Sequence, residues 1–413
     1  MLKKTIEINL ICITVMILLT GLNCSEDTSV DEPPVVDPNT TIIDLGSNLQ
    51  IIRGFGGVNM PGWINDMTAA QLNTAFGTGT GQIGLSILRI RVPYDSSKFE
   101  LEVPAAKLAH SLGAVIIASP WTPPPWMKSN NNIIGGTLNV NAYSYYAAHL
   151  KSFTDYMSAE GVPLYAVSLQ NEPDVNVNYE SCRWSASQFI KFLIENAPSI
   201  GSNIIVPEIS DFNHNISDAI LNDVAASSNV FIIGGHIYGG GIESYHLAVN
   251  KGKEVWMTEH LDLDTTWNGA LGTAIEINDC MNAGMQAYLW WYIRRFYGPI
   301  NDDGQVTKRG YVISQFARFV RPGSVMVKTS TNPQDYVYVT SYKYGPETVI
   351  VAVNDNFGPV NHTFILQNGS VSNFSQYITS YYKNCSADSG IQAVNNSFSV
   401  TLDSLSVTTF ISE

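Results

Sequence analysis

Basic side chains are scarce in this 413-residue chain, which has 22 lysines and arginines against 36 aspartates and glutamates. The net charge of −14 and the pI near 4.9 argue against nucleic acids and anionic membranes as partners, because both attract proteins through a basic surface. Charged residues make up only 14% of the chain and hydrophobic residues 45%, so it can bury a large core, and we expect two domains. An uncharged polymer suits this acidic chain better as a partner than a nucleic acid or an anionic membrane does.

Cysteine and metal-binding patterns are also sparse. Apart from Cys12 and Cys24, the chain has only Cys182, Cys280 and Cys385, which could form one bridge but no disulfide framework. The seven histidines are scattered, and no Cys-x-x-Cys or His-x-x-x-His spacing occurs. We therefore expect no metal site and no cofactor.

We expect the first 24 residues to be an export signal, because Lys3 and Lys4 precede an apolar stretch over 8–22 that is too short to span a bilayer comfortably. This segment resembles a bacterial lipoprotein signal in which Cys24 becomes the lipidated N-terminus. The acidic, proline-rich residues 25–40 are typical of an extended tether. The acidic start of the tether resembles surface-export signals of Bacteroidetes lipoproteins, which implies a location on the outer-membrane surface. Ordinary secretion is the alternative.

Between residues 51 and 319, apolar runs alternate with segments of helical periodicity. Eight runs have the length of buried parallel strands, near positions 51, 86, 114, 164, 203, 230, 254 and 287. Eight such repeats over about 270 residues match the size of a (β/α)8 TIM barrel. A doubly wound open sheet is the competing fold, but no Gly-x-Gly-x-x-Gly turn opens a helix. We therefore predict an α/β fold with the barrel over 51–319.

From residue 320 onward, the hydrophobic period changes to two. Strand-like segments occur, separated by turn signals and without intervening helices, at 335–344, 348–355, 362–369 and 397–402. We predict a side β-sandwich domain over 320–413, and residues 41–50 are expected to supply its first strand.

Two glutamates follow predicted barrel strands. Glu172, next to Asn171, follows the fourth run, and Glu259 follows the seventh. Either glutamate alone would be interpreted more simply as a helix cap or a loop charge. The carboxyl ends of barrel strands converge on one face, so the pair is expected to lie across one cleft. Two carboxyl groups placed in this way can hydrolyse a glycosidic bond, one as acid and one as nucleophile.

The two carboxyl groups need different protonation states. We assign Glu172 as acid/base and Glu259 as the nucleophile, which must stay ionised beside donors such as His236 or Tyr238. The nearby negative charge is expected to raise the pKa of Glu172. A retaining mechanism predicts a carboxyl separation of about 5 to 5.5 Å, and inversion requires a wider gap.

Several motifs together resemble glycoside hydrolase family 30, and in particular its bacterial glucuronoxylanases. They cover the predicted barrel and reach the side domain: GFGG (54–57), SILRIR (86–91), ASPWTPPPWM (118–127), SLQNEPD (168–174), GGHIYGG (234–240), WMTEH (256–260), WWYIRRFYGP (290–299) and KRGYVISQFARFVRPG (308–323). The resemblance implies a retaining, endo-acting hydrolase of β-1,4-xylan with a barrel and a side β-sandwich, which we expect to be monomeric.

The resemblance also assigns residues. It implies Glu172 as acid/base and Glu259 as nucleophile, with the reacting sugar held by Trp121, Asn171 and Tyr238. In the final strand motif, Arg295 matches an arginine that pairs with the carboxylate of a 4-O-methylglucuronate branch on xylan. The aromatics supporting the same branch match Trp291 and Tyr297. A guanidinium suits this task because it can bind a carboxylate bidentately; the simpler interpretation of Arg295 is a buried ion pair.

The chain departs from the family pattern directly after Glu259. Leu261 to Asp264 stand where the family has a tyrosine and a serine for the glucuronate, and acidic residues there would repel a carboxylate. Three alternatives therefore stay open: a family 30 xylanase that does not require glucuronate, a hydrolase of another β-glycan, and a surface glycan-binding protein on an inactive barrel.

Further side chains could line the cleft. Trp63, Trp126 and Trp184 are candidate sugar platforms, although each could equally be loop packing. One of Arg89 and Arg91 is expected to reach the cleft and to hold Glu259 ionised.

Overall fold

The structure is a computed structural model that describes residues 39–330 and 333–412. The predicted export signal, Cys24 and nearly all of the predicted tether lie outside these residues. None of the helices that the structure describes is long and apolar enough to cross a membrane. Cys182, Cys280 and Cys385 are all buried and free, so the single disulfide that the sequence left open is absent from the described residues.

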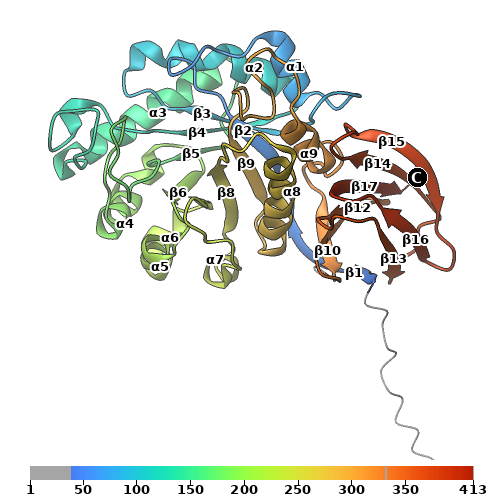
Figure 1. Ribbon diagram of the computed structural model, residues 1–413. Coiled ribbons are helices and arrows are strands. Elements are labelled where there is room, and N and C mark those ends of the chain that lie inside the picture. Colours follow the sequence, from blue (N-terminus) through green and yellow to red (C-terminus); the bar gives the residue numbers. More distant parts are fainter. Residues whose placement is uncertain (1–38, 331–332, 413) are drawn as a thin grey trace, which may run out of the picture. The chain divides into compact units, whose positions relative to one another are not determined.

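Eight parallel strands form a closed barrel in which the last strand pairs with the first (Figure 1). Its strands are β2 (Gly54–Val58), β3 (Ile87–Arg91), β4 (Val115–Ser119), β5 (Ala166–Ser168), β6 (Ile204–Ile209), β7 (Ile232–His236), β8 (Glu254–His260) and β9 (Ala287–Tyr292). Each strand coincides with one of the eight apolar runs. The predicted TIM barrel is confirmed.

Helices follow the strands and cover the outside of the barrel (Figure 1). They are α1 (Ala69–Phe76), α2 (Val103–Ser111), α3 (Tyr143–Ala159), α4 (Ala186–Glu195), α5 (Asn215–Asn222), α6 (Val224–Ser228), α7 (His246–Asn250), α8 (Trp267–Asn282) and α9 (Lys308–Ala317). Hydroxyl side chains cap the helices that follow several barrel loops: Thr68 and Ser185 form capping boxes, and Thr266 and Thr307 accept hydrogen bonds from the first turns of α8 and α9.

Strand alternation decides which side chains enter the barrel. In β3, Leu88 and Ile90 pack in the core shared with the helices, whereas Ile87 belongs to a cluster with residues of β4 to β9 inside the barrel. Because side chains alternate along a strand, Arg89 points inward as Ile87 does, one layer closer to the carboxyl ends. The sequence thereby places a guanidinium in the barrel interior.

The second sheet is mostly antiparallel and has nine strands, in the order β15-β14-β17-β12-β11-β10-β1-β13-β16. They are β1 (Thr40–Ile51), β10 (Val325–Thr329), β11 (Val337–Tyr344), β12 (Glu347–Asn354), β13 (Val360–Gln367), β14 (Asn373–Thr379), β15 (Ser386–Gln392), β16 (Ser397–Leu402) and β17 (Ser406–Ser412). Strands from opposite ends of this order meet through aromatic rings, with Phe364 5.4 Å from Phe410 and Phe374 4.9 Å from Phe398. The sheet therefore folds over its own core, as a side β-sandwich does.

The side domain braces the helices that follow β8 and β9 (Figure 1). The Gln315 amide of α9 donates to Thr379 Oγ1 at 2.7 Å, and Thr409 Oγ1 donates to Gln315 Oε1 at 2.5 Å. In addition, Trp267 Nε1 of α8 donates to the Leu405 carbonyl at 3.1 Å. The loops that lead from the last two barrel strands into α8 and α9 are consequently fixed at one end by the second sheet.

Candidate active site

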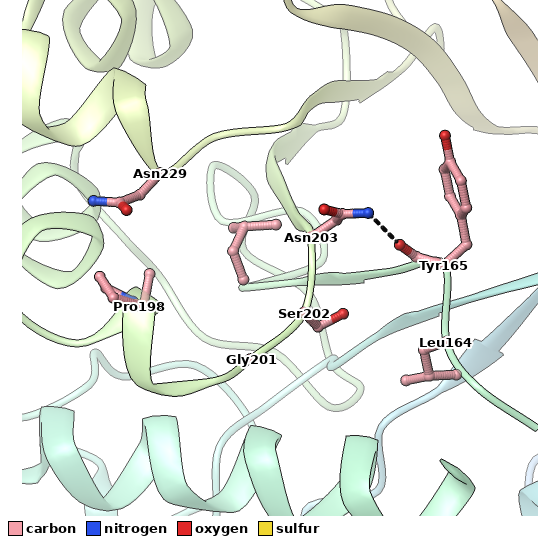
Figure 2. A pocket seen from close by; sticks show the side chains of 9 residues that line it. Leu164, Tyr165, Pro198, Gly201, Ser202, Asn203 and Asn229 are labelled. Atoms are coloured by element: carbon pink, nitrogen blue, oxygen red, sulfur yellow. Dashed lines mark hydrogen bonds between the residues drawn. The ribbon is translucent and has the colours of Figure 1, made fainter.

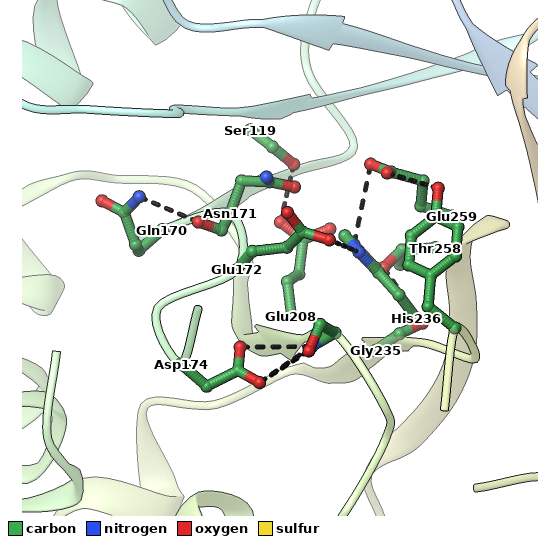
Figure 3. A network of polar contacts seen from close by, with 12 residues as sticks. Ser119, Gln170, Asn171, Glu172, Asp174, Glu208, Gly235, His236, Thr258 and Glu259 are labelled. Carbon is green, nitrogen blue, oxygen red and sulfur yellow. Dashed lines mark hydrogen bonds and ion pairs between the residues drawn. The ribbon is translucent and has the colours of Figure 1, made fainter. Parts of the chain in front are cut away.

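Glu172 and Glu259 lie close together at the carboxyl end of the barrel. Glu172 follows β5 and Glu259 lies near the end of β8, and their exposed fractions are only 8% and 5%. His236, the last residue of β7, lies between them, with Nδ1 3.2 Å from Glu172 Oε1 and Nε2 3.8 Å from Glu259 Oε2 (Figure 3). One oxygen of each glutamate and one nitrogen of His236 all lie within 4.8 Å of one another.

The backbone at Glu172 is held in a conformation that non-glycine residues seldom adopt. Its φ is 45°, in the left-handed region. Two backbone hydrogen bonds hold this segment, from Glu172 N–H to the Glu208 carbonyl and from Asn171 N–H to the Pro120 carbonyl, both at 2.9 Å. Strain of this kind is retained where a side chain must be aimed at a functional site.

Arg89 connects most of the polar residues of the site. It is fully buried, and it donates from Nη1 to Glu259 Oε2 at 2.6 Å and from Nη2 to Asn171 Oδ1 at 2.7 Å. Glu208 Oε1 lies 3.1 Å from the same Nη2. Burial by itself lowers the pKa of Arg89, but the carboxylates of Glu208 and Glu259 raise it above its ordinary value. Arg89 is therefore a permanent cation beside Glu259. The sequence predicted that either Arg89 or Arg91 would take this role, and the structure shows that Arg89 does.

Tyr238 is the second donor to Glu259. Its hydroxyl donates to Glu259 Oε1 at 2.9 Å, so both oxygens of this carboxylate accept a hydrogen bond, one from Tyr238 and one from Arg89. Both donors stabilise a negative charge on Glu259. Burial and the neighbouring Glu259 carboxylate raise the pKa of Tyr238 far above its ordinary value, so Tyr238 stays a donor.

The donors around Glu172 reverse the direction predicted for its pKa. Burial raises this pKa, but His236 and the Tyr179 hydroxyl, which donates to Glu172 Oε2 at 2.9 Å, lower it below its ordinary value. Burial lowers the pKa of His236, and the charges of Glu259 and Glu172 raise it overall. The prediction that negative charge would raise the pKa of Glu172 is wrong, because Arg89 already compensates Glu259 and the nearest titrating group is a histidine.

The group of Glu172, His236 and Glu259 also has the spacing of a small metal site. The Arg89 guanidinium lies 2.6 Å from Glu259, however, and this fixed positive charge would repel a cation bound to the same carboxylate. We therefore interpret the three side chains as an acid–base site.

Aromatic side chains form one wall beside these groups. Trp121 is almost fully buried, with ring centroids 5.7 Å from Trp63 and 5.8 Å from Trp291, and the Arg89 guanidinium lies 4.9 Å above its ring. The structure thus brings Trp121 and Trp291, both predicted site residues, into contact. By contrast, Trp184 is buried against Phe189 and is loop packing.

Arg294 and Arg295 have different surroundings. Arg294 lies 3.2 Å from Asp302 and donates to the Asn65 carbonyl at 2.7 Å, as expected for a structural residue. Within residues 39–330 and 333–412, no ion pair involves Arg295, so the buried ion pair considered for it does not occur there. The pKa of Tyr297 is raised to about 12, mainly by burial and also by the Glu259 charge, against the opposing charge of Arg295. Tyr297 therefore lies within electrostatic reach of both Arg295 and Glu259.

The acidic loop after β8 is tied to α9. The buried Arg309 lies 3.3 Å from Asp262 Oδ2 and donates to the Asp264 carbonyl at 2.7 Å and to the Tyr297 carbonyl at 2.8 Å. The Asp264 carboxylate accepts a hydrogen bond from Thr266 N–H at 2.8 Å, before α8 begins. Both acidic side chains thus have partners within the fold, which weakens the repulsion expected from the sequence.

The sequence analysis did not predict some residues of the site. Glu208 and Ser119 complete the Arg89 network, with Ser119 Oγ donating to Glu208 Oε2 at 2.8 Å (Figure 3). Glu208 follows an apolar strand run, the same signal that identified Glu172, and could have been found in that way. Tyr179 lies in an irregular loop with no motif that marks it.

Similarity to known proteins agrees with this geometry. The model of the glycosyl hydrolase family 30 TIM-barrel domain matches residues 90–254. The glucuronoxylanase XynC of Bacillus subtilis is 42% identical over 425 residues, which cover 99% of this chain and 98% of that protein. This chain belongs to glycoside hydrolase family 30. The family 30 resemblance of the sequence motifs is thereby confirmed, and the chain is a glycoside hydrolase.

Solved structures of family 30 enzymes have the same architecture. A family 30 subfamily 8 xylanase of Clostridium acetobutylicum is 39% identical, with a TM-score of 0.86 over 91% of this chain and all of that one. An endoxylanase of Clostridium papyrosolvens is 36% identical, with a TM-score of 0.84 over the same shares. This family 30 hydrolase therefore shares its barrel and side domain with both enzymes.

Proposed function

We propose that the protein hydrolyses β-1,4-xylan at internal linkages with retention of anomeric configuration. The observation that supports retention is the short distance between Glu172 and Glu259. One oxygen of each carboxyl group lies within 4.8 Å of the other, with His236 between them. An inverting enzyme needs room for a water between its carboxyl groups, a separation of about 6.5 to 9.5 Å. Similarity over almost the whole chain to a protein named as a glucuronoxylanase supports xylan as the substrate.

In the first step, Glu259 attacks the anomeric carbon and forms a glycosyl ester, while Glu172 gives its proton to the leaving oxygen. In the second step, Glu172 takes a proton from water, the water oxygen bonds to the anomeric carbon, and the ester bond to Glu259 breaks. Tyr238 and Arg89 stabilise Glu259 as an anion before attack and as a leaving group afterwards. Asn171, oriented by Arg89, lies beside Glu172 and can hydrogen-bond a hydroxyl of the reacting sugar.

His236 supplies the proton that Glu172 needs. In the free enzyme the raised pKa of His236 and the lowered pKa of Glu172 favour the proton on the imidazole over the carboxyl group. A sugar in the site would separate Glu172 from water and favour its neutral form, so the proton would pass across the 3.2 Å between His236 Nδ1 and Glu172 Oε1.

The glucuronate branch is proposed to bind at Arg295, supported by Trp291 and Tyr297. The guanidinium without an ion-pair partner in the described chain is the observation that favours this assignment. Comparing the products from glucuronoxylan and from unbranched arabinoxylan tests it. If Arg295 binds the branch, each product carries one glucuronate at a fixed distance from its reducing end, and Arg295→Ala abolishes this pattern. Equal cleavage of both polymers would identify a family 30 xylanase that does not require glucuronate.

We also propose that the protein is exported and anchored by a lipid on Cys24. The support is the sequence alone: two lysines, an apolar stretch, and a cysteine followed by an acidic tether. Labelling of the parent with a radioactive fatty acid, and loss of label in Cys24→Ala, is the expected result. Unlabelled parent protein in the culture medium would favour ordinary secretion.

A further inference from the structure

Two exposed aromatic side chains lie together outside the glutamate pair. Trp126 is in a short 3-10 helix (Pro125–Met127) and is 60% exposed, and Tyr145 is in the first turn of α3 and is 59% exposed. Their ring centroids are 5.5 Å apart at an interplanar angle of 69°. Exposing two large aromatic rings to water costs free energy, so a pair of them at the surface indicates a binding site for a ligand.

The hollow beside these rings is lined without any charged side chain. Its lining consists of Trp126, Asn139, Val140, Asn141, Ala142 and Tyr145. In a chain with a net charge of −14, an uncharged patch favours an uncharged ligand. An aromatic face beside amide groups suits a sugar ring, which has an apolar face and hydroxyls at its edge.

The loop that carries Trp126 is fixed before any ligand binds. Lys128 is buried, and its ammonium donates to Thr122 Oγ1 at 2.7 Å and to the Ser181 carbonyl at 2.6 Å. The Asn139 N–H donates to the Met127 carbonyl at 2.9 Å, which closes the loop on itself. A rigid platform loses little conformational entropy on binding.

The platform lies at the end of the barrel that holds the glutamates. Trp126 is in the loop that leaves the carboxyl end of β4, and the same loop contains Trp121. A different hollow, lined by Leu164, Tyr165, Pro198, Ser202 and Asn203, lies before β5 and β6 at the opposite end of the barrel (Figure 2). Of these two hollows, the one at Trp126 and Tyr145 lies at the end of the barrel where neighbouring units of the same polymer can occupy the cleft.

We propose that Trp126 and Tyr145 form an auxiliary site that binds an uncharged stretch of the polysaccharide backbone beyond the catalytic cleft. This inference rests on the proposed function and adds a second point of attachment to the same chain. Binding at two points raises the effective concentration of polymer at the cleft and leaves short substrates unaffected.

The test compares Trp126→Ala and Tyr145→Ala with Tyr344→Ala, an exposed tyrosine of the side domain that serves as a matched control. Binding is measured by retention in native gels that contain arabinoxylan or, as an anionic probe, polygalacturonate, in a Glu259→Gln background that does not digest the polymer. Hydrolysis is measured with Glu259 intact, on polymeric glucuronoxylan and on a short xylo-oligosaccharide that carries one glucuronate.

We expect each of the two variants to bind arabinoxylan about tenfold more weakly, the size typical of truncating an aromatic anchor, and to lose kcat/KM only on the polymer. Tyr344→Ala should match the parent. Unchanged retention and hydrolysis in both variants, or equal losses on polymer and oligosaccharide, would overturn the auxiliary site while the proposed function stands. A parent that releases no sugar from any xylan would overturn both.

Discussion

At the scale of single residues, two chemically identical side chains, Glu172 and Glu259, differ in the hydrogen-bond donors that surround them. Glu259 accepts hydrogen bonds from a permanent cation, Arg89, and from Tyr238, whereas Glu172 faces His236, which can carry a proton. An acid needs a proton source and a nucleophile needs fixed positive charge, so the environment assigns the roles.

The nucleophile role of Glu259 predicts a specific rescue. Glu259→Ala should lower kcat on xylan by at least about 10⁴-fold, because the covalent step is lost. Added azide should restore part of the rate and yield a glycosyl azide of inverted configuration, identified by NMR. Rescue of Glu172→Ala under the same conditions should instead give a product of retained configuration. A Glu259→Ala variant as fast as the parent would refute the assignment.

The hydroxyl of Tyr179 predicts a shift in the pH profile. It donates to Glu172 and helps to hold the pKa of this carboxyl below its ordinary value, so Tyr179→Phe should raise that pKa. Glu172 must be protonated to act as an acid, and the alkaline limb of kcat/KM should therefore move to higher pH. Profiles of the parent, Tyr179→Phe and the control Tyr344→Phe are compared. No movement, or movement to lower pH, would contradict this role.

At the scale of elements, the charge of a buried carboxyl group at the start of α2 is only weakly compensated. Glu102 is almost fully buried, neither of its side-chain oxygens has a hydrogen-bond partner, and the nearest cation, Arg91 Nε, is 3.9 Å away. Burial raises the pKa of Glu102 well above its ordinary value, and the charge of Arg91 only partly opposes this. The proton that the folded state retains makes stability depend on pH.

Glu102→Gln should therefore stabilise the protein near neutral pH. Because the folded pKa lies above the unfolded one, stability is greatest below the unfolded pKa and falls as pH rises toward the folded pKa. The substitution removes this loss, so Tm should rise near pH 7 and change little near pH 4. Thermal unfolding at both pH values tests this, with the exposed Glu100→Gln as control. A lower Tm near pH 7 would show that Glu102 stabilises the fold as an anion.

At the scale of the whole molecule, the two sheets depend on each other. Gln315 is fully buried and hydrogen-bonds Thr379 and Thr409 of the side domain. Gln315 belongs to α9, and Trp267 of α8 also donates to the side domain. The loops that carry Asp262 and Tyr297 lead into these two helices. The side domain therefore contributes to the site by fixing these helices.

Gln315→Leu should lower the free energy of unfolding by about 1 to 3 kcal/mol, because the buried hydrogen bonds between the Gln315 side chain and the hydroxyls of Thr379 and Thr409 are lost. We expect one unfolding transition for barrel and side domain, with coincident urea curves from tryptophan fluorescence and far-UV circular dichroism. The exposed Gln367→Leu on β13 is the control. Two separate transitions in the parent would show that the domains unfold independently.

The sequence by itself determined the eight barrel strands, because each is a largely buried apolar run between helical segments, and it singled out Glu172 and Glu259 at strand ends. The side domain was less visible: β10, β14, β15 and β17 were not predicted, and β15 is largely exposed and lacks an apolar alternation.

Only the tertiary structure decided the partners of each charge. Arg89, Glu208, His236 and Tyr179 come from four different parts of the chain, and the direction of the Glu172 pKa follows from their distances. Likewise, the sequence does not distinguish Trp126 and Tyr145 from Trp184. Only the packing in the structure shows that the first two side chains are exposed and that Trp184 is buried. Sequence patterns report which residues are apolar and where strands end, whereas electrostatic energies depend on contacts between residues far apart in the chain.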